Sequence, residues 1–462
     1  MHGMDRNDSM KNPHEYLNRD ILVLLLGDIL IAAFCCHSIL SLQTGWLHFG
    51  LHNQTNILSY VCILILCSLS IELYHIRTGQ LNFLLRILSA SVFAFIVFTS
   101  MHHLLYVFPD MKTIYHILVI FFGLQWVWHF SFITIKNVKS NRKQVLILGS
   151  GQQAKIIGSL IDNHKNGYRL AGYVQTPELP LQVPRDQILG LWDRLLNIIE
   201  KVKPQLLVVC LKEKRGILPL EDILASKFNG IEIYEMVTFY EKLTGKLLIE
   251  HTTPGWFIFS GGFKTSISQR IAQEILNKLL ATIGLSIILP FFPLAALMIK
   301  LDSPGPVFYR QVRIGHKGRS FILYKLRTMV DNAETCAGAQ WACENDPRIT
   351  KSGRLLRKMR MDELPQLYNV LKGDLSIVGP RPERPEFIER LKKVIPYYEK
   401  RHFVKPGVTG WAQINYPYGA SEKDALEKLR FDLYYIKHFS ILFDLTIIWK
   451  TFGVVLEGRG AR

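Results

Sequence analysis

Four long apolar segments in the first third of the chain constrain its fold more than any other feature. They lie at residues 21–42, 57–73, 84–108 and 114–135, and each approaches the ~20 residues that a helix needs to cross ~30 Å of hydrocarbon. Hydrophobic residues make up 49% of the chain, and their concentration in such segments indicates membrane helices rather than an oversized soluble core. The sequence therefore predicts a membrane protein whose first domain, residues 1–140, contains four transmembrane helices.

The basic residues of the loops predict the orientation of these helices. Lysines and arginines cluster before the first segment and after the fourth, at Arg6, Lys11, Arg19, Lys136, Lys139, Arg142 and Lys143. Residues 43–56 contain none, the second loop carries Arg77 and Arg86, and the third carries only Lys112. Because cytoplasmic loops are enriched in Lys and Arg, the N-terminus and everything after Lys136 are expected in the cytoplasm.

The chain is strongly basic, with 55 Lys and Arg against 38 Asp and Glu, a formal net charge of +17. Two explanations stand side by side. One is the positive-inside bias together with attraction to anionic lipids; the other is binding of phosphate-bearing substrates. Nucleic acid is not an expected partner, because the basic residues flank membrane segments and no nucleic-acid-binding motif is present.

Residues 141–262 alternate between short apolar strands and helices, which predicts a small, doubly wound, Rossmann-like α/β domain. Strands are expected at 144–151, 170–176, 205–212 and 231–236, and helices near 154–163, 192–202 and 220–227. The first turn, Gly149-x-Gly151-x-x-Ala154, is a weak match to a dinucleotide-binding turn. An acidic residue should then end the second strand, but that strand leads into Thr176, and Glu178 comes only further on. A structural or ligand-sensing domain is therefore favoured over a working NAD site.

A fifth apolar segment, residues 279–299, is interrupted by Pro290 and Pro293. It is long enough to span the bilayer, yet basic residues flank it on both sides. They are Lys278 before it, and Lys300, Arg310, Arg313, Lys317, Arg319, Lys325 and Arg327 after it. Proline inside a helix removes a hydrogen bond and clashes with the preceding turn, so two prolines three residues apart favour a sharp bend. A re-entrant helix, entering and leaving on the cytoplasmic side, is therefore favoured over a kinked spanning helix.

An acidic pair, Asp362–Glu363, stands in a basic environment. The basic residues just before it are Arg354, Arg357, Lys358 and Arg360. Pro365 suits the first turn of a helix, so the pair is expected near a helix N-terminus, where the helix dipole favours anions. A structural alternative is that Asp362 caps this helix while Glu363 faces water. The concentration of cations favours bound phosphate instead.

Arg381 lies between Pro380 and Pro382, directly after a predicted strand. Flanking prolines restrict the backbone to extended conformations, so the guanidinium is held at little cost in entropy. This pattern predicts a phosphate-binding arginine rather than an ordinary surface residue. A further loop, residues 404–411, combines Lys405, a Pro–Gly turn and Trp411, and it either lines a nucleotide pocket or simply packs.

These motifs occur together in a recognisable order. From about Ser266 to the C-terminus, the chain resembles the bacterial sugar transferase family, the monotopic polyprenyl-phosphate phosphoglycosyl transferases. The resemblance rests on SPGPVFYRQVRIGHKGRSFILYKLRTM, DPRITKSGRLLRKMRMDELPQLYNVLKGDLSIVGPRPE, VKPGVTGWAQIN and LRFDLYYIKHFSILFDLTIIWKT. It implies that residues 263–462 form an α/β monotopic transferase domain with a re-entrant membrane helix. The order of the three domains is similar to that of the family's large members, which initiate exopolysaccharide, capsule or O-antigen assembly.

The resemblance also implies roles for individual residues. Asp362 would be a nucleophile that attacks the sugar-bearing phosphate of a UDP-sugar, releases UMP, and carries the phosphosugar until polyprenyl (undecaprenyl) phosphate accepts it. Asp362 and Glu363 would hold Mg²⁺. The matching phosphate-binding and pocket positions are Lys325, Arg357, Arg381, Lys405 and Asp432. The enzyme would work at the bacterial inner (cytoplasmic) membrane, with UDP-sugar, polyprenyl phosphate and membrane lipids as partners.

Two features of the membrane segments complete this comparison. Many family members have serine directly before the proline that breaks the re-entrant helix, whereas Leu289 precedes Pro290 here and cannot bond a freed carbonyl. Pro293 or Ser286 would have to compensate. The last apolar stretch, 439–456, is interrupted by polar residues and is better suited to an interfacial amphipathic helix than to a spanning one.

Two other functions stay open. The Gly149 turn could belong to a membrane-anchored NAD-dependent nucleotide-sugar epimerase or dehydratase. Such an enzyme would need the missing acidic residue and a Tyr–Lys pair in the same domain, and the sequence spacing shows neither. A non-catalytic regulator that binds nucleotide sugar would leave the acidic pair idle. The sequence does not choose the hexose, and it leaves formation of a homo-oligomer open.

Overall fold

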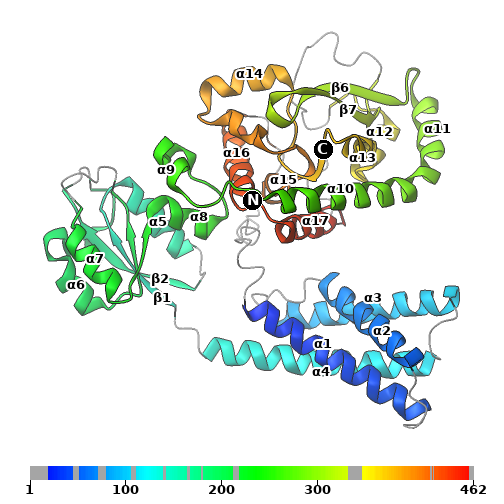
Figure 1. Ribbon diagram of the computed structural model, residues 1–462, viewed down its shortest axis with the longest axis horizontal. Coiled ribbons are helices and arrows are strands. Elements are labelled where there is room, and N and C mark those ends of the chain that lie inside the picture. The colour runs from blue at the N-terminus through cyan, green and yellow to red at the C-terminus, as the bar shows by residue number, and fades with distance from the viewer. Residues whose placement is uncertain are drawn as a thin grey trace. The chain divides into compact units, whose positions relative to one another are not determined.

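The computed structural model describes residues 19–44, 51–70, 80–105, 111–138, 142–163, 167–177, 181–211, 218–330, 346–416, 419 and 421–456. These residues belong to two compact units, one within His14–Arg142 and one within Lys143–Arg462 (Figure 1). The elements described in the first unit are all helices, and the strands that the structure describes lie in the second.

The first unit consists of helices α1 (Arg19–Thr44), α2 (Leu51–Ser70), α3 (Gln80–Leu105) and α4 (Met111–Val138). Their shared core includes the fully buried side chains of Leu64, Ala94 and Phe121. Three helices in the described part of the chain are long and apolar enough to cross a membrane: Leu22–Ile39 in α1, Met111–Phe132 in α4, and Ile267–Asp302 in the second unit. The described apolar stretches of α2 and α3, Ile57–Ser68 and Arg86–Met101, are shorter, so four N-terminal spans remain a prediction. The loop residues Arg6, Lys11, Arg77 and Lys139 lie outside the described residues.

A buried polar cluster connects three of these helices. Asp28 of α1 lies against Gln125 and His129 of α4, and all three residues are at most 1% exposed. The Gln125 amide donates to Asp28 Oδ2 at 2.6 Å and to the Ser68 hydroxyl of α2 at 3.1 Å, while His129 Nε2 lies 3.1 Å from Asp28 Oδ1. Polar groups inside a helical membrane bundle pair with one another because lipid offers them no hydrogen bonds.

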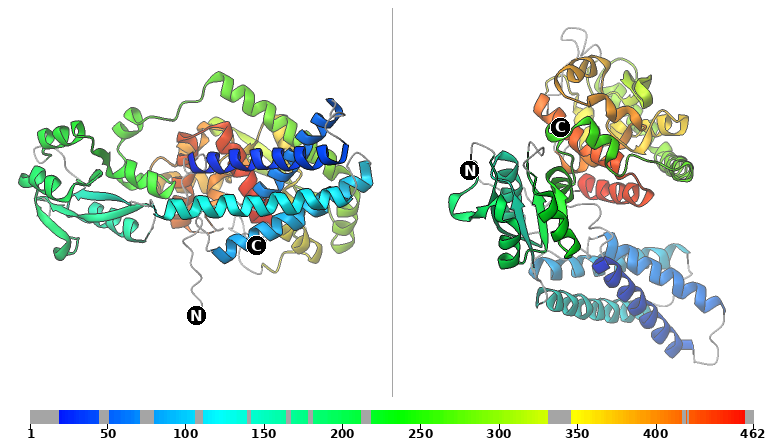
Figure 2. Two further views of the ribbon diagram at one scale, coloured as in Figure 1. Left: turned by 90° about the horizontal axis from the view of Figure 1, so that it is seen from below. Right: turned by 60° about the vertical axis from the view of Figure 1, so that its left-hand side comes forward.

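The second unit begins with a five-stranded parallel sheet. Its strands are β1 (Lys143–Leu148), β2 (Tyr168–Gln175), β3 (Ile188–Leu191), β4 (Leu206–Val209) and β5 (Glu232–Glu235), in the order β3-β2-β1-β4-β5. Helices α5 (Gln152–Asn163) and α8 (Met236–Thr244) pack on one face, and α6 (Leu195–Val202) and α7 (Leu220–Phe228) pack on the other (Figures 1 and 2). Alternate residues of β1 therefore enter opposite cores, Val145 and Ile147 on one side and Leu146 and Leu148 on the other.

Four of the five strands lie where the sequence predicts them. The exception is β3, where Gly190 interrupts the apolar residues and weakens the strand pattern, and where Leu189 and Leu191 are exposed. Its pairing with β2 completes the sheet edge.

The rest of the second unit consists of two small two-stranded sheets and the helices that precede, connect and follow their strands. The hairpin β6 (Phe308–Ile314) and β7 (Ser320–Leu326) is antiparallel, and β8 (Ser376–Val378) pairs in parallel with β9 (Gly407–Thr409). The helices are α9 (Pro254–Phe259), α10 (Ile267–Ile288), α11 (Phe292–Asp302), α12 (Lys351–Lys358), α13 (Gln366–Lys372), α14 (Pro385–Val394), α15 (Trp411–Asn415), α16 (Glu422–Lys437) and α17 (Ile441–Leu456). Short 3-10 turns at Met361–Glu363 and Tyr398–Phe403 connect some of them.

Polar contacts join the parallel-sheet part to this helical part. Glu241 of α8 is buried and binds Lys437 Nζ at 2.6 Å and His438 Nε2 at 2.5 Å, both at the end of α16. The Trp411 indole donates to the Gly245 carbonyl just after α8 at 2.8 Å. Because these groups are removed from water, they fix α8 on α16 in one geometry.

The apolar segment with two prolines is bent as its sequence predicts. The 3-10 turn Leu289–Phe291, which contains Pro290, separates α10 from α11, and Pro293 lies in the first turn of α11. Figure 1 shows α11 leaving in a different direction from α10.

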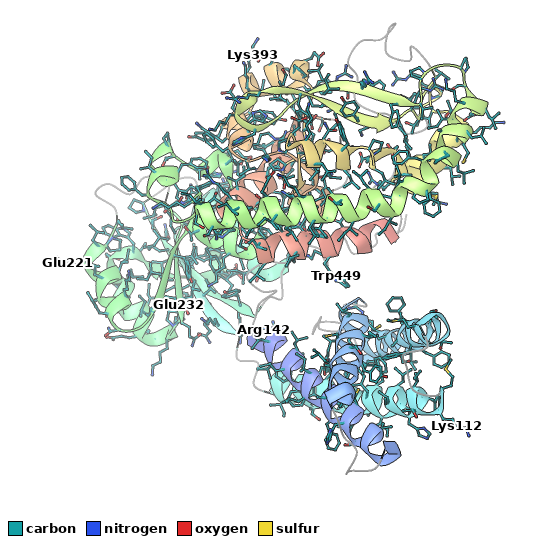
Figure 3. The ribbon with its side chains drawn as sticks, turned by 45° about the vertical axis from the view of Figure 1, so that its right-hand side comes forward. Lys112, Arg142, Glu221, Glu232, Lys393 and Trp449 are labelled. Atoms are coloured by element: carbon teal, nitrogen blue, oxygen red, sulfur yellow. The ribbon has the colours of Figure 1, made fainter. Side chains whose placement is uncertain are left out.

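The bent pair of helices and α17 expose apolar side chains. Residues four apart along α10 form a stripe that is 47–77% exposed, namely Ile267, Ile271, Ile275, Leu279, Ile283 and Ile287. On α17, Leu442, Leu445 and Trp449 are also exposed, and Figure 3 shows Trp449 projecting from that helix. Exposed apolar surface of this extent is typical of contact with lipid or protein.

Candidate active site

The acidic pair lies in a tight turn of its own. Asp362 and Glu363 belong to the 3-10 turn Met361–Glu363, and α13 begins at Gln366, directly after Pro365. The pair therefore precedes the predicted helix by one turn rather than standing at its N-cap. Arg360, just before the turn, adopts a left-handed conformation with φ 57°. Such backbone costs free energy for a non-glycine residue and is concentrated at functional sites.

Glu363 is clamped by cations. Its Oε1 accepts hydrogen bonds from Arg381 Nη2 at 2.5 Å and from Lys325 Nζ at 3.0 Å, and its Oε2 lies 3.9 Å from Arg360 Nη1. Burial alone would raise the pKa of Glu363, but the charges of Arg381 and Lys325 outweigh burial and hold that pKa well below its usual range. Glu363 is therefore an anion at neutral pH.

Asp362 differs from its neighbour. It is 7% exposed, and no residue that the structure describes donates a hydrogen bond to its side chain. Burial raises the pKa of Asp362, the negative charge of Glu363 raises it further, and Lys325, Arg357 and Arg381 oppose the shift. A carboxylate with little hydration and no hydrogen-bond donor keeps its lone pairs available for reaction.

Three of the predicted basic residues meet at this turn from separate elements. Lys325 comes from β7, Arg381 from the loop after β8, and Arg357 from α12, where its Nε donates to the Thr328 hydroxyl at 2.9 Å. Burial lowers the pKa of Lys325, and the charge of Glu363 opposes that effect. Glu363 neutralises part of the positive charge of these three residues. The net positive charge left near Asp362 would stabilise an incoming phosphate.

The other two predicted residues lie in different places. Lys405 Nζ binds Glu274 Oε2 of α10 at 2.8 Å and does not contact the acidic pair. Asp432 of α16 is buried against Arg401, with 2.8 Å between Asp432 Oδ2 and Arg401 Nη2. Burial raises the pKa of Asp432 to about 6, although the charge of Arg401 opposes it.

Arg401 was missed by sequence reasoning and links Asp432 to the site. Its Nη2 also donates to the Arg381 carbonyl at 2.9 Å, so Asp432 supports the loop that holds Arg381. Arg401, Glu383, Tyr398 and Lys428 line a small cavity beside this loop. Because the partners are 31 positions apart on separate elements, no spacing signal in the sequence could have paired Arg401 with Asp432.

The first glycine of the turn after β1 packs closely against the neighbouring strand end. A Cβ at Gly149, where φ is +142°, would lie 2.5 Å from the Cys210 carbonyl oxygen of the neighbouring strand end, and a Cβ at Gly158 would overlap the Tyr173 hydroxyl. Thr176 is buried next to Ser150 at this turn, and Glu178 lies outside the described residues. These glycines are thus required by contact between elements.

The structure does bring together a Tyr–Lys pair in this domain, which the sequence spacing did not reveal. Lys242 Nζ of α8 donates to the Tyr234 hydroxyl of β5 at 2.8 Å. That hydroxyl also lies 3.4 Å from Glu232, which pairs with Lys143 at the start of β1. The pair therefore faces the amino ends of the strands, whereas the Gly149 turn follows the carboxyl end of β1, and the two cannot serve one NAD site.

The acidic pair has the donor atoms of a magnesium site. Mg²⁺ prefers hard oxygen ligands and is commonly held by one or two carboxylates together with substrate phosphates. The described residues contain no cluster of three or more His, Cys, Asp or Glu side chains suited to a metal. Two adjacent carboxylates, one of them without a hydrogen-bond donor, therefore fit an ion that is shared with a bound diphosphate.

A bent apolar helix together with a buried carboxylate pair among cations defines a membrane-associated protein with a site for anionic groups. Residues 268–458 match the family described as "Bacterial sugar transferase". The chain is 41% identical over 183 residues to the exopolysaccharide production protein PSS of Rhizobium leguminosarum bv. phaseoli, covering 92% of that protein and 37% of this chain. The protein belongs to the bacterial sugar transferase family.

Longer relatives are matched in part. The chain is 41% identical over 232 residues to a UDP-N-acetylgalactosamine-undecaprenyl-phosphate N-acetylgalactosaminephosphotransferase of Aeromonas hydrophila, covering 50% of this chain and 54% of that one. It is 44% identical over 188 residues to a UDP-glucose:undecaprenyl-phosphate glucose-1-phosphate transferase of Escherichia coli (strain K12), covering 39% of each. The aligned region thus spans about half or less of the length of these two relatives.

Proposed function

We propose that this protein transfers a sugar 1-phosphate from a UDP-sugar to polyprenyl phosphate, releases UMP, and so initiates assembly of an exopolysaccharide, capsule or O-antigen. The names of the relatives from Aeromonas hydrophila and Escherichia coli, which describe this type of transfer, support the proposal. The observation that carries it is the contrast within the acidic pair: Glu363 is held by two cations, while Asp362 is buried without a hydrogen-bond donor among the described residues.

The first half of the proposed reaction forms a covalent intermediate on Asp362. A carboxylate oxygen of Asp362 bonds to the sugar-bearing phosphorus of the UDP-sugar, and the bond from that phosphorus to the oxygen bridging the two phosphates breaks. The electron pair leaves with UMP. In the second half, an oxygen of polyprenyl phosphate attacks the same phosphorus, and the Asp362 carboxylate is released. Both half-reactions balance without a protein acid, because the leaving groups are a phosphate and a carboxylate.

The basic residues have distinct tasks in this proposal. Lys325 and Arg381 fix Glu363 and place positive charge beside Asp362, and Arg357 adds a third charge from α12. Fixed cations in a partly dehydrated site stabilise charge that develops on phosphate oxygens. Asp362 and Glu363 would hold Mg²⁺, which supplies neutralisation of the diphosphate charge when bound.

The other predicted residues belong to the surroundings of the site. Asp432, through Arg401, would support the loop of Arg381 and border the nucleotide pocket. Lys405 would act at the edge of the site, where Glu274 now holds it. The Rossmann-like middle domain, residues 141–262, is proposed as a structural or ligand-sensing domain between the transmembrane helices and the transferase domain.

The membrane placement is also part of the proposal. We place the protein in the bacterial inner membrane with the second unit in the cytoplasm, α10 and α11 as a re-entrant helix pair, and α17 at the interface. The exposed stripe of α10 and the exposed apolar residues of α17 support lipid contact. This placement would bring the acidic pair to the level of lipid phosphate groups.

A half-reaction assay tests the proposal. The full-length protein in bilayer nanodiscs is mixed with Mg²⁺ and a UDP-sugar, either UDP-glucose or a UDP-N-acetylhexosamine, without lipid acceptor. We expect UMP in an amount no greater than the protein and a phosphosugar adduct on Asp362 by mass spectrometry. Adding polyprenyl phosphate should discharge the adduct and start turnover. UMP formation only in the presence of the lipid, with no adduct, would show direct transfer and reject the covalent mechanism.

A further inference from the structure

One buried arginine holds the end of the bent membrane helix. Arg327 follows β7 directly; its Nη1 donates to the Pro304 carbonyl at 2.8 Å, and its Nη2 donates to Ser303 at 2.6 Å and Ile299 at 3.4 Å. These three carbonyls belong to the last turn of α11 and the residues just after it. Arg327 is only 5% exposed. A guanidinium offers several donors in one plane, so it can hold three carbonyls at once, which a lysine ammonium on its flexible stem cannot reproduce.

The same short segment carries groups of the active site. Lys325, two residues before Arg327, donates to Glu363 at 3.0 Å. Thr328, the next residue after Arg327, accepts a hydrogen bond from Arg357 Nε at 2.9 Å. Residues 325–328 therefore contact the membrane helix, the acidic pair and α12 within four positions of chain.

A second connection starts from α11 itself. Oδ2 of Asp302, the last residue of α11, accepts hydrogen bonds from the Ser352 backbone N–H at 2.6 Å and the Ser352 hydroxyl at 2.7 Å, in the first turn of α12. Gly353 of the same turn allows α12 to lie close to the segment after β7, because a Cβ there would overlap the Thr328 carbonyl. The end of α11 is thus bound to both elements that supply Lys325 and Arg357.

Apolar packing makes these connections stiff. Ala295 and Ile299 of α11 share a small core with Leu326 of β7 and Leu356 of α12. A closely packed core resists deformation, so a displacement of α11 should also displace β7 and α12.

We propose that Arg327 is a positioning residue that couples the seating of α11 in the bilayer to the alignment of Lys325 and Arg357 on the acidic pair. In the described part of the chain its side-chain hydrogen bonds all go to backbone carbonyls at the end of α11, so it acts through other residues. The position of the membrane helix α11, as well as the packing of the protein core, then determines where the residues of the active site lie. The inference rests on the proposed function, because UMP release is its readout.

The first experiment compares bilayer with detergent. UMP release by the full-length protein, with polyprenyl phosphate present so that turnover occurs, is measured in nanodiscs and in micelles for the unaltered protein, Arg327→Gln, Arg327→Lys and the control Arg390→Gln. Arg390 is an exposed arginine of α14 paired with Glu422, and its variant should behave as the unaltered protein. We expect Arg327→Gln to lower kcat about 30-fold in nanodiscs with little change in KM, because misplacement by about 1 Å can cost about 100-fold. Arg327→Lys should restore only part of this loss.

The ratio of the two rates separates coupling from general stability. The unaltered protein should release UMP about tenfold faster in nanodiscs than in micelles. A factor of this size is typical of coupling between two sites of one protein. In Arg327→Gln, the ratio of the nanodisc rate to the micelle rate should fall toward one. An unchanged ratio in Arg327→Gln would overturn the proposal, whatever its absolute rate. Thermal melting of each variant identifies a loss of fold, and Arg327→Lys carries the test if Arg327→Gln is unfolded.

A double-mutant cycle completes the test. Because Arg327 is proposed to act through Lys325 and Arg357, part of its effect should already be lost in Lys325→Gln, and the Lys325→Gln/Arg327→Gln double variant should lose less activity than the two single losses combined. Additive losses would also overturn the proposal. If the unaltered protein releases no UMP from any UDP-sugar, the proposed function fails and takes this inference with it; if it does and Arg327→Gln matches it, only the inference fails.

Discussion

Two turns in the second unit resemble ligand sites in sequence, and the structure builds them in opposite ways. At the Gly149 turn, the backbone packs directly against the end of the neighbouring strand, since a Cβ would meet the Cys210 carbonyl at 2.5 Å. Around Asp362 and Glu363, three elements deliver cations to a partly dehydrated pair of carboxylates. Close packing is enough to explain the glycines. A buried carboxylate without a hydrogen-bond donor costs free energy, so its presence is better explained by a function.

The acidic turn also separates its two carboxylates by environment. Glu363 has its charge compensated within the protein, as its strongly lowered pKa shows, and Asp362 does not, as its raised pKa shows. Pairs of titratable groups whose environments push their pKa values apart are typical of sites with divided chemical roles. Nothing comparable occurs among the described residues of the Gly149 turn.

The largest effect is expected from Asp362→Asn. The amide keeps the shape of the side chain but cannot form the phosphoryl bond, so UMP release and sugar phosphate transfer should fall on the order of 10³-fold or more. The measurement is single-turnover UMP release with mass spectrometry of the protein. Asp193→Asn, an exposed acid of the parallel-sheet domain, serves as the matched control. Normal transfer by Asp362→Asn would show that Asp362 is not the nucleophile, and the contrast with the Gly149 turn would then have no functional meaning.

A smaller loss is expected from Arg381→Gln. The substitution removes the strongest hydrogen bond to Glu363 and one phosphate-facing charge, so kcat should fall about 10- to 100-fold. Arg381→Lys should recover only part of the loss, because a single ammonium cannot reproduce a planar fork. Steady-state kinetics with the UDP-sugar checks this. Equal kcat in the lysine variant and the unaltered protein would show that charge alone matters at this position.

The pH dependence of UMP release should report Asp362. Only the ionised carboxylate is nucleophilic, and its pKa is raised, chiefly by burial and next by the charge of Glu363. The rate should therefore fall as pH is lowered through a midpoint above the ~3.9 of an ordinary aspartate, about tenfold per unit below that midpoint. Arg381→Gln should shift the midpoint further upward, because Arg381 lowers this pKa. A midpoint at or below the ordinary value, with the fold intact by circular dichroism, would contradict the assignment.

The smallest effect on activity is expected at the glycine turn. Gly149→Ala should lower stability by about 2 kcal/mol, because its φ of +142° is strained for alanine and the added Cβ meets Cys210. UMP release per folded molecule should stay unchanged. Gly167→Ala is the matched control, since its φ of +77° is also left-handed but its surroundings are open, so only the backbone strain of about 1 kcal/mol applies. Loss of activity in folded Gly149→Ala would give this turn a functional role after all.

Local sequence patterns predicted much of the fold for identifiable reasons. Long apolar segments indicated α1 to α4, short buried runs indicated β1, β2, β4 and β5, and Pro290 with Pro293 indicated the break between α10 and α11. Each of these signals is contained in a single stretch of chain. The short edge strand β3 carries no such signal, because its pairing with β2 and not its own composition makes it a strand.

The site shows the same division between local and long-range information. The sequence by itself determined the acidic pair, the concentration of basic residues before it, and the proline-held Arg381. Only the tertiary structure decided that Glu363 rather than Asp362 takes Lys325 and Arg381, that Arg401 joins Asp432 to the Arg381 loop, and that Lys405 pairs with Glu274. Residue types and short spacings are written in the chain, but which charges neutralise one another depends on distances between elements far apart in sequence, and these exist only after packing.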